Sequence, residues 1–208
     1  MIITIDGPAG SGKSTAARML SQRLGFHFLD TGAMYRAVAL TCVQEGVDPA
    51  NTVAAADASR RTLITEEVTD TIRTPVVTTA ASVVAANPEV RAQLVNIQRM
   101  AAEGLDIVCE GRDQGTVVFQ NAQCKFFLTA SIESRATRRQ AEMAKSGTKL
   151  DLEEVITQLR DRDARDASRD IAPMVPADDA IQIDTSDLKI DEVLDQLETL
   201  ARSKMSPT

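Results

Sequence analysis

Short apolar runs alternate along the chain with longer segments in which apolar positions recur every three or four residues. A short apolar run is typical of a buried strand, and the longer periodic pattern is typical of a helix with one buried face. The predicted strands are 2–5, 26–29, 107–109, 126–128 and 180–183. The predicted helices are 14–24, 33–45, 75–86, 88–102, 132–145, 152–169 and 190–204. This alternation favours an α/β fold in which helices flank a five-stranded parallel sheet.

Glycines and one irregular stretch mark where predicted elements end. Glycine often follows the last turn of a helix, because it adopts a left-handed conformation without strain. The glycines in such places are Gly25, Gly46, Gly104 and Gly147. The stretch 47–74 has no regular pattern, and Asp48-Pro49 ends the helix before it. We interpret 47–74 as a small insertion lobe that holds one helix and short extended pieces.

The first predicted strand runs directly into the glycine-rich turn Gly7-Pro-Ala-Gly-Ser-Gly-Lys-Ser14. The pattern G-x-x-x-x-G-K-[ST] between a strand and a helix is typical of a loop that binds the phosphates of a nucleoside triphosphate. Its backbone N–H groups and the helix N-terminus attract the anion. We expect Lys13 to reach the β- and γ-phosphates and the Ser14 hydroxyl to ligate Mg²⁺. The residues predicted to bind ATP are Gly7, Pro8, Ala9, Gly10, Ser11, Gly12, Lys13, Ser14 and Thr15.

The composition excludes several kinds of partner. The chain has 208 residues and a formal net charge of −7, which is a poor match for nucleic acid or an anionic membrane. Its apolar runs stay far below the roughly 18 residues of a membrane-spanning helix, and its N-terminus enters a strand without a signal peptide. We therefore expect a cytoplasmic monomer with no nucleic-acid partner and no membrane partner.

The cysteines and the single histidine do not form a pattern typical of a metal site. Cys42, Cys109 and Cys124 are widely spaced, so we expect buried thiols in a reducing compartment. His27 stands inside a predicted strand, and we expect it to pack there rather than to act in catalysis.

Two groups of arginines are candidate anion sites in this acidic chain. Arg162, Arg165 and Arg169 share one face of the predicted helix 152–169, and a stripe of acidic residues runs beside them. The acidic residues are Asp163, Asp166 and Asp170. Phosphoryl transfer needs fixed positive charge around the transferred group, which favours an anion-binding role. The alternative is a solvated helix face with internal ion pairs.

The second group, Arg135, Arg138 and Arg139, lies on the predicted helix 132–145, just before the segment 145–149. This arrangement suits a lid that folds over a triphosphate and excludes water. The alternative is surface ion pairing, for which Glu133 and Glu142 are the partners at hand.

Two predicted strands end in polar turns. Glu110-Gly-Arg-Asp-Gln-Gly115 follows one of them, and Asp30-Thr-Gly-Ala-Met-Tyr-Arg36 follows the other. Ligands of an open α/β sheet bind beyond the carboxyl ends of its strands, where Arg112 with Asp113 and Thr31 with Arg36 would lie. A plain turn is the alternative for the first segment. The convergence of these groups beside the phosphate loop points to a second, anionic substrate.

At this point the sequence resembles bacterial cytidylate kinases, within the nucleoside monophosphate kinase family. The matching segments are I-D-G-P-A-G-S-G-K-S-T, D-T-G-A-M-Y-R, A-A-S-V-V-A, E-G-R-D-Q-G-T-V-V-F, R-D-R-D-A-R-D-A-S-R and I-A-P-M-V-P-A-D-D-A. They follow in order from Ile5 to Ala180, so the resemblance covers nearly the whole chain. The phosphate loop is shared with many ATPases and GTPases, whereas the glycine-arginine-aspartate and arginine-rich segments are far more selective.

The resemblance implies a single kinase domain, 1–208, with an acceptor-binding region at 36–103 and a lid at 135–169. The positions that match the acceptor site are Ser82, Arg91 and Asp113 for the base, Arg162 and Asp166 for the ribose, and Arg36, Arg112 and Arg169, beside Thr31 and Tyr35, for the monophosphate. The implied catalytic residues are Lys13, Arg112, Arg135, Arg139 and Arg169. Of these, Arg135 and Arg139 are the lid arginines that face the triphosphate. The implied cofactor is Mg²⁺ at Ser14, with Glu110 in its outer shell, and the implied reaction is phosphoryl transfer from ATP to CMP or dCMP.

Two departures and two alternatives accompany this resemblance. The stretch 47–74 is shorter than is usual for the bacterial family, and Glu110 stands where many relatives carry Asp. One alternative is a kinase for another acceptor such as UMP or AMP, although the Gly-Gly-Gly loop expected of a shikimate kinase is absent. The other is a nucleotide-dependent switch, although the Asn-Lys-x-Asp motif of a GTPase is also absent.

Overall fold

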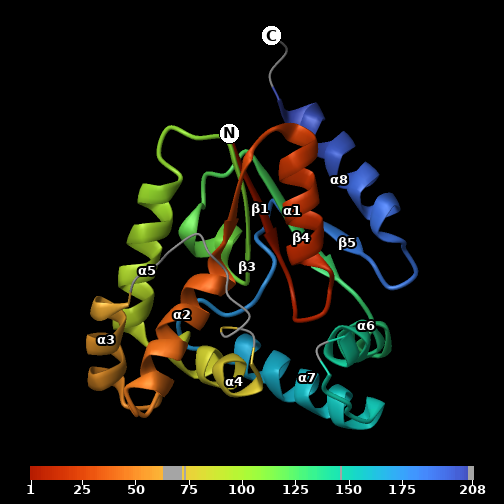
Figure 1. The fold of residues 1–208 in the computed structure, drawn as a ribbon. Coiled ribbons are helices and arrows are strands. Elements are labelled where there is room, and N and C mark those ends of the chain that lie inside the picture. The colour runs from red at the N-terminus through yellow and green to blue at the C-terminus, as the bar shows by residue number, and fades with distance from the viewer. Residues whose placement is uncertain (63–71, 73, 146, 206–208) are drawn as a thin grey trace. The chain divides into compact units, whose positions relative to one another are not determined.

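Two units make up the computed structural model, which describes residues 1–62, 72, 74–145 and 147–205. The larger unit, here called the sheet unit, comprises Met1–Leu29 and Gly104–Thr208. The smaller unit, here called the helical unit, comprises Asp30–Glu103. Figure 1 labels the elements of both units.

A five-stranded sheet forms the centre of the sheet unit, in the order β2-β3-β1-β4-β5. The strands are β1 (Ile2–Asp6), β2 (His27–Asp30), β3 (Ile107–Gly111), β4 (Cys124–Thr129) and β5 (Ile181–Asp184). β1 pairs in parallel with β3 and with β4, and β4 pairs in parallel with β5. The prediction of a five-stranded parallel sheet is therefore confirmed.

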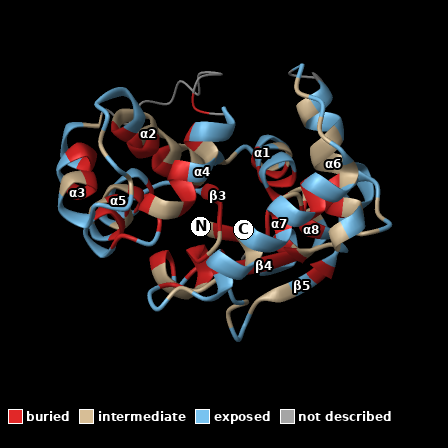
Figure 2. Cartoon of the chain, turned by 90° about the horizontal axis from the view of Figure 1, so that it is seen from below, coloured by how far each residue is buried: buried red, intermediate tan, exposed pale blue. Residues whose placement is uncertain are grey.

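The register of the sheet brings the carboxyl ends of its central strands to one edge. Asp6, the last residue of β1, lies opposite Gly111 on β3 and Phe127 on β4. Every residue of β3 is buried, which explains why this strand reads as an apolar run, and Figure 2 shows the buried residues in red. The turn that follows each strand at this edge is where a ligand of a parallel sheet is expected.

Of the helices of the sheet unit, the first and the last pack against the strands. The helices of this unit are α1 (Lys13–Leu24), α6 (Ile132–Lys145), α7 (Leu152–Ala167) and α8 (Ile190–Lys204). α1 and α8 lie side by side (Figure 1) and share an apolar core with the sheet that includes Leu20, Phe126 and Leu194. A short π-helical turn, η2 (Gln114–Val118), follows β3 and was not predicted.

The helical unit consists of α2 (Thr31–Gln44), α3 (Thr52–Arg61), α4 (Pro75–Val84) and α5 (Pro88–Ala101). α2 packs on α3 and α4, and α3 packs on α5. Side chains cap the first turns: Asp30 accepts from the N–H of Ala33 at 2.8 Å, which explains why α2 begins before the predicted boundary. The predicted insertion lobe contains α3, and residues 63–71 and 73 of it lie outside the described residues.

Two expectations about single positions need correction. His27 lies in β2 as expected, but its side chain is exposed and does not pack in the core. The helix predicted over 152–169 ends at Ala167, with Ser168 as its C-cap, so Arg169 and Asp170 follow the helix instead of continuing its face.

The predictions for the cysteines and for the helix-end glycines are confirmed. The three cysteines are free and buried. The four predicted helix-end glycines all have positive φ, between +66° and +81°. None of the helices that the structure describes is long and apolar enough to cross a membrane.

Candidate active site

The phosphate loop connects β1 to α1 and depends on close backbone packing. A Cβ on Gly7 would lie 2.1 Å from the carbonyl oxygen of Leu128, so only glycine fits at this point of the turn. Gly12 adopts a left-handed conformation at the N-cap of α1, with φ of +86°. The N-terminal amides of α1 are therefore directed into the loop, as anion binding requires.

Lys13 is buried at the start of α1 and lies beside a carboxylate from β3. Its Nζ donates to the carbonyl oxygen of Pro8 at 3.2 Å and lies 3.9 Å from Oε2 of Glu110. Burial and the nearby charge of Arg112 lower the pKa of Lys13 from 10.5 to about 7, against the opposing effect of Glu110. A bound phosphate group would favour the charged ammonium, because it adds the negative charge that this buried position lacks.

Ser14 and Glu110 form an oxygen-rich pair next to the loop. The Ser14 hydroxyl is exposed and donates to Oε1 of Glu110 at 2.9 Å. A hydroxyl and a carboxylate from these two elements are the hard oxygen ligands that Mg²⁺ prefers, so the residues fit the ion. The described residues hold no cluster of three or more acidic, histidine or cysteine side chains, so phosphate oxygens and water would complete the coordination.

Asp166 on α7 gathers three arginines around one buried carboxylate. It accepts from Nε of Arg112 at 2.9 Å and from the guanidinium of Arg169, and Nε of Arg162 lies 3.9 Å away. Burial acts to raise the pKa of Asp166, but Arg112, Arg169 and Arg162 outweigh it and hold the pKa below its usual value. Three cations around one anion leave a positive surplus, which suits an anionic ligand.

The predicted arginine stripe is therefore only partly correct. Arg165 is exposed and its Nε donates to the carbonyl oxygen of Asp161 within the same helix. Arg162 and Arg169 join instead with Arg112, which comes from the turn after β3. Helical spacing identified the cationic region, but it gave no sign that the neighbouring Asp166 organises it.

The two predicted lid arginines have different surroundings. Arg135 is buried and donates to the carbonyl oxygen of Ala9 in the phosphate loop at 3.1 Å, and to Asp163 at 2.6 Å. Ala9 also packs in an apolar cluster with α6 and α7. Arg139 pairs with Glu142 at 3.2 Å, which is the surface ion pairing that the sequence left open as an alternative.

A cavity of about 220 Å³ lies beside the phosphate loop and combines apolar walls with a few polar groups. Its lining residues are Gly10, Ser11, Gly12, Thr15, Arg138, Glu142, Thr185, Leu188, Ile190 and Val193. Thr185 connects this wall to the loop, because its hydroxyl lies 3.1 Å from the carbonyl oxygen of Ser11 and accepts from Arg138. The position next to the triphosphate loop makes this cavity a candidate for the donor base.

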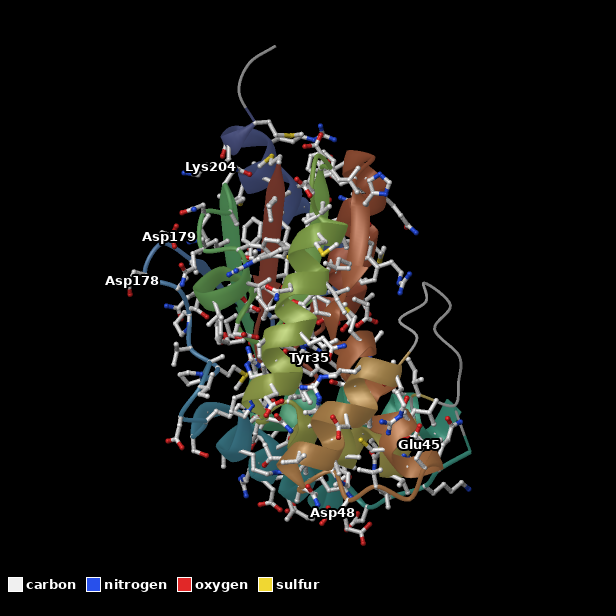
Figure 3. The ribbon with its side chains drawn as sticks, turned by 90° about the vertical axis from the view of Figure 1, so that its left-hand side faces the viewer. Tyr35, Glu45, Asp48, Asp178, Asp179 and Lys204 are labelled. Atoms are coloured by element: carbon white, nitrogen blue, oxygen red, sulfur yellow. The ribbon has the colours of Figure 1, made fainter. Side chains whose placement is uncertain are left out.

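The helical unit carries the remaining residues predicted for the acceptor. On α2, Arg36 pairs with Asp30 at 3.2 Å, Thr31 is buried, and the ring of Tyr35 (Figure 3) lies 5.9 Å from the guanidinium carbon of Arg91. Arg91 on α5 is buried and donates to the carbonyl oxygen of Ala85 at 3.3 Å.

Ser82 on α4 is also buried, and its hydroxyl has no hydrogen-bond partner among the residues that the structure describes. A buried hydroxyl of this kind is a candidate for contact with a ligand.

Sequence reasoning missed two features of the sheet unit, the π-helical turn η2 and the Asp6 carboxylate that holds it. Asp113 is buried at the start of η2, and the backbone of this turn is held by Asp6, a residue to which the sequence assigned no role. The only sequence signal for the turn is the pair of glycines, Gly111 and Gly115, that brackets Arg112 and Asp113. Neither glycine indicates a π-helical turn by itself.

A phosphate loop after the first strand of a parallel five-stranded sheet, with a group of half-buried arginines around Asp166, defines a P-loop kinase. Residues 3–203 match the sequence profile of the cytidylate kinase family. The chain is 45% identical to the cytidylate kinase of Desulforamulus reducens, with 95% of both chains covered. It is 42% identical to the cytidylate kinase of Geobacter sulfurreducens, with 100% of this chain and 95% of that one covered. The chain belongs to the cytidylate kinase family.

Solved structures agree on the fold. An uncharacterized protein from Eubacterium ventriosum has a TM-score of 0.58 at 15% identity, with 98% of both chains covered. The shikimate kinase of Bacteroides thetaiotaomicron has a TM-score of 0.52 at 10% identity, with 97% of this chain and 98% of that one covered. At these identities the likeness concerns the fold alone.

Proposed function

We propose that this protein transfers the γ-phosphoryl group of ATP to CMP, and to dCMP, giving ADP and the nucleoside diphosphate. Membership of the cytidylate kinase family supports the reaction. The observation that carries it at the site is the group of half-buried arginines around the buried Asp166, which lies in the same unit as the phosphate loop and contributes charge to the environment of Lys13.

The donor is held by the phosphate loop. The loop amides and Lys13 bind its phosphates, and the cavity lined by Leu188 and Ile190 takes its base. Mg²⁺ would be held by Ser14 with Glu110, and it would supply positive charge that neutralises the phosphate groups. Arg135, already bonded to the loop carbonyl of Ala9, is close enough to the donor site to stabilise added negative charge there.

The acceptor phosphate is bound by cations. We assign Arg36, Arg112 and Arg169 to it. Asp166 keeps the guanidinium groups of Arg112 and Arg169 oriented, and Asp30 does the same for Arg36. In this proposal Ser82, Arg91 and Asp113 contact the cytosine, and Arg162 with Asp166 contacts the ribose. The unpartnered hydroxyl of Ser82 supports the first assignment.

Catalysis on this proposal consists of positioning and charge stabilisation. The acceptor phosphate oxygen attacks the γ-phosphorus in line with the leaving oxygen of ADP, and fixed cations stabilise the charge that spreads over the transferred group. The monophosphate is already largely ionised at neutral pH, so the reaction needs no dedicated general base. We place it in the cytoplasm, where the three buried thiols would stay reduced, and we expect the enzyme to act as a monomer.

The test is ADP production by the purified protein with ATP and Mg²⁺, measured separately with CMP, dCMP, UMP, AMP, GMP and no acceptor. We expect strong stimulation by CMP and dCMP alone. Equal stimulation by UMP would retain the kinase but contradict the roles given to Ser82, Arg91 and Asp113. ADP production that no acceptor stimulates would contradict the proposed function.

A further inference from the structure

One buried carboxylate connects the phosphate loop to the turn that carries Arg112 and Asp113. Asp6 is the last residue of β1, and the loop begins at the next residue, Gly7. Its Oδ1 accepts from the N–H of Gln114 at 2.9 Å, and its Oδ2 accepts from the N–H of Gly115 at 2.8 Å. Both oxygens of this one side chain are therefore bonded to the backbone that directly follows Asp113.

The backbone that Asp6 holds has an unusual conformation. Gln114–Val118 form a π-helical turn, in which the N–H of Phe119 donates to the carbonyl oxygen of Gln114 at 2.7 Å. Asp113, just before the turn, has φ of −146° and ψ of 22°, outside the regular helical and strand regions. Single π-helical turns are rare and occur often at functional sites.

Gly115 allows the close approach that these bonds need. A Cβ at this position would lie 3.0 Å from Oγ1 of Thr4, 3.2 Å from Cδ of Lys125 and 3.5 Å from Oδ2 of Asp6. Lys125 in turn donates to the carbonyl oxygen of Gln120 at 2.6 Å and to Asp179 (Figure 3) at 2.8 Å, which fixes the chain just beyond the turn.

Burial and the two amide bonds act in opposite directions on the pKa of Asp6. Burial raises the pKa of Asp6 to about 7, while the N–H groups of Gly115 and Gln114 act to lower it. The charges that bear on Asp6 from the turn itself are Asp113, which raises the pKa, and Arg112, which lowers it. A buried acid that is retained next to a phosphate loop at this cost is better explained by a positioning role than by packing.

We propose that Asp6 is a positioning residue, whose carboxylate fixes η2 and thereby holds Arg112 and Asp113 in register with the phosphate loop. This inference rests on the proposed function, in which Arg112 and Asp113 bind the acceptor and the loop binds the donor. Asp6 itself touches neither substrate. Its loss would misplace the acceptor-binding side chains, and a displacement of about 1 Å is enough to lower turnover by as much as about a hundredfold.

The test compares Asp6→Asn with Asp195→Asn, a matched change of an exposed carboxylate on α8 that pairs with Arg23 of α1. Asparagine has one acceptor oxygen for two N–H groups, so one amide of the turn loses its partner. In Asp6→Asn we expect the KM for CMP to rise and kcat to fall, which together lower kcat/KM by about tenfold or more. The Kd for ATP should stay within about twofold of wild type. Asp195→Asn should match wild type in the KM for CMP, in kcat and in the Kd for ATP.

A second variant keeps the test valid if Asp6→Asn does not fold. Gly115→Ala leaves the Asp6 carboxylate intact but crowds Thr4 and Lys125, which displaces the turn, and it should give the same rise in the KM for CMP with an unchanged Kd for ATP. Unchanged acceptor kinetics in a folded Asp6→Asn, or weakened ATP binding with an unchanged KM for CMP, would overturn the inference.

Amide exchange separates this inference from the proposed function. Measured by NMR on the intact protein without nucleotides, at least one of the amides of Gln114 and Gly115 should lose protection in Asp6→Asn, and both should keep it in Asp195→Asn, whatever the enzyme phosphorylates. Unchanged protection would overturn the inference even if CMP is the acceptor. Lost protection in a protein that CMP does not stimulate would contradict the proposed function instead.

Discussion

Burial acts in opposite directions on two charged side chains of the sheet unit. It raises the pKa of Asp6 from 3.8 to about 7, and it lowers the pKa of Lys13 from 10.5 to about 7. Both groups are thus held in environments that disfavour their charged forms. The surrounding fold keeps both side chains in these unfavourable environments, as is common where a protein prepares a site for a charged ligand.

These two shifts predict how stability depends on pH. Between about pH 4 and 7 folded Asp6 binds more protons than the unfolded chain, so its contribution to the free energy of unfolding falls as pH rises. Between about pH 7 and 10 the unfolded chain keeps the Lys13 proton that the folded protein has lost, so the Lys13 contribution rises with pH. The sum of the two contributions to the free energy of unfolding is therefore smallest near pH 7.

Urea unfolding from pH 5 to pH 9 would check this prediction. The difference between wild type and Asp6→Asn should vary with pH only on the acid side of 7, and the difference between wild type and Lys13→Met only on the alkaline side. Differences that are constant across the whole range would mean that neither group has a shifted pKa.

At the scale of elements, the N-cap of α5 makes a clear prediction for the helical unit. Oδ1 of Asn87 accepts from the N–H groups of Glu89 and Val90, and Nδ2 donates to the carbonyl oxygen of Thr52 at the start of α3. Asn87→Ala removes a buried cap and a bond between two helices, so we expect a loss of about 1 to 3 kcal/mol in the free energy of unfolding.

A matched variant isolates the cap in that measurement. Asn51→Ala removes the N-cap of α3, which bonds to the N–H of Ala54 from an exposed position. By urea unfolding it should cost about 1 kcal/mol or less. An equal cost for both variants would show that the bond from Asn87 to Thr52 contributes nothing.

The elements also show how far the sequence could go. Strands such as Ile107–Gly111 were predictable because each of their residues is buried, so the apolar run and the strand nearly coincide. Helices 132–145 and 190–204 match α6 and α8 at both ends, because periodicity and helix-forming residues persist throughout them. Local pattern was sufficient wherever one element determines its own conformation.

The sequence fell short where a partner far along the chain decides the structure. η2 depends on a carboxylate more than 100 residues away, and no periodicity reports such a bond. The sequence predicted an anion site at the arginines of 162–169, but their helical spacing could not distinguish the half-buried Arg169, which pairs with Asp166, from the exposed Arg165. The tertiary structure determines which arginine pairs with which carboxylate.

At the scale of the whole molecule, all residues assigned to the donor belong to the sheet unit, and α2 to α5 belong to the helical unit. The protein has a formal net charge of −7, so an anionic donor must bind through local positive charge around Lys13 and the loop amides. Ligand binding to the folded protein alone adds RT ln(1 + [L]/Kd) to its stability. The gain in stability on donor binding therefore measures binding at the phosphate loop, and it requires no catalysis.

We expect a nonhydrolysable ATP analogue with Mg²⁺, at one hundred times its Kd, to raise the free energy of unfolding by about 2.7 kcal/mol in wild type. Lys13→Met should lose most of this gain at the same ligand concentration, because a buried apolar group then replaces the cation facing the phosphates. Lys204→Met, which removes an exposed lysine near the end of α8 (Figure 3), should keep it in full. If the two units unfold in separate steps, the analogue should stabilise the sheet unit against its own unfolding step. Amide exchange in β1 and β4 would monitor that step. A gain that Lys13→Met retains would mean that the nucleotide binds elsewhere than at the loop.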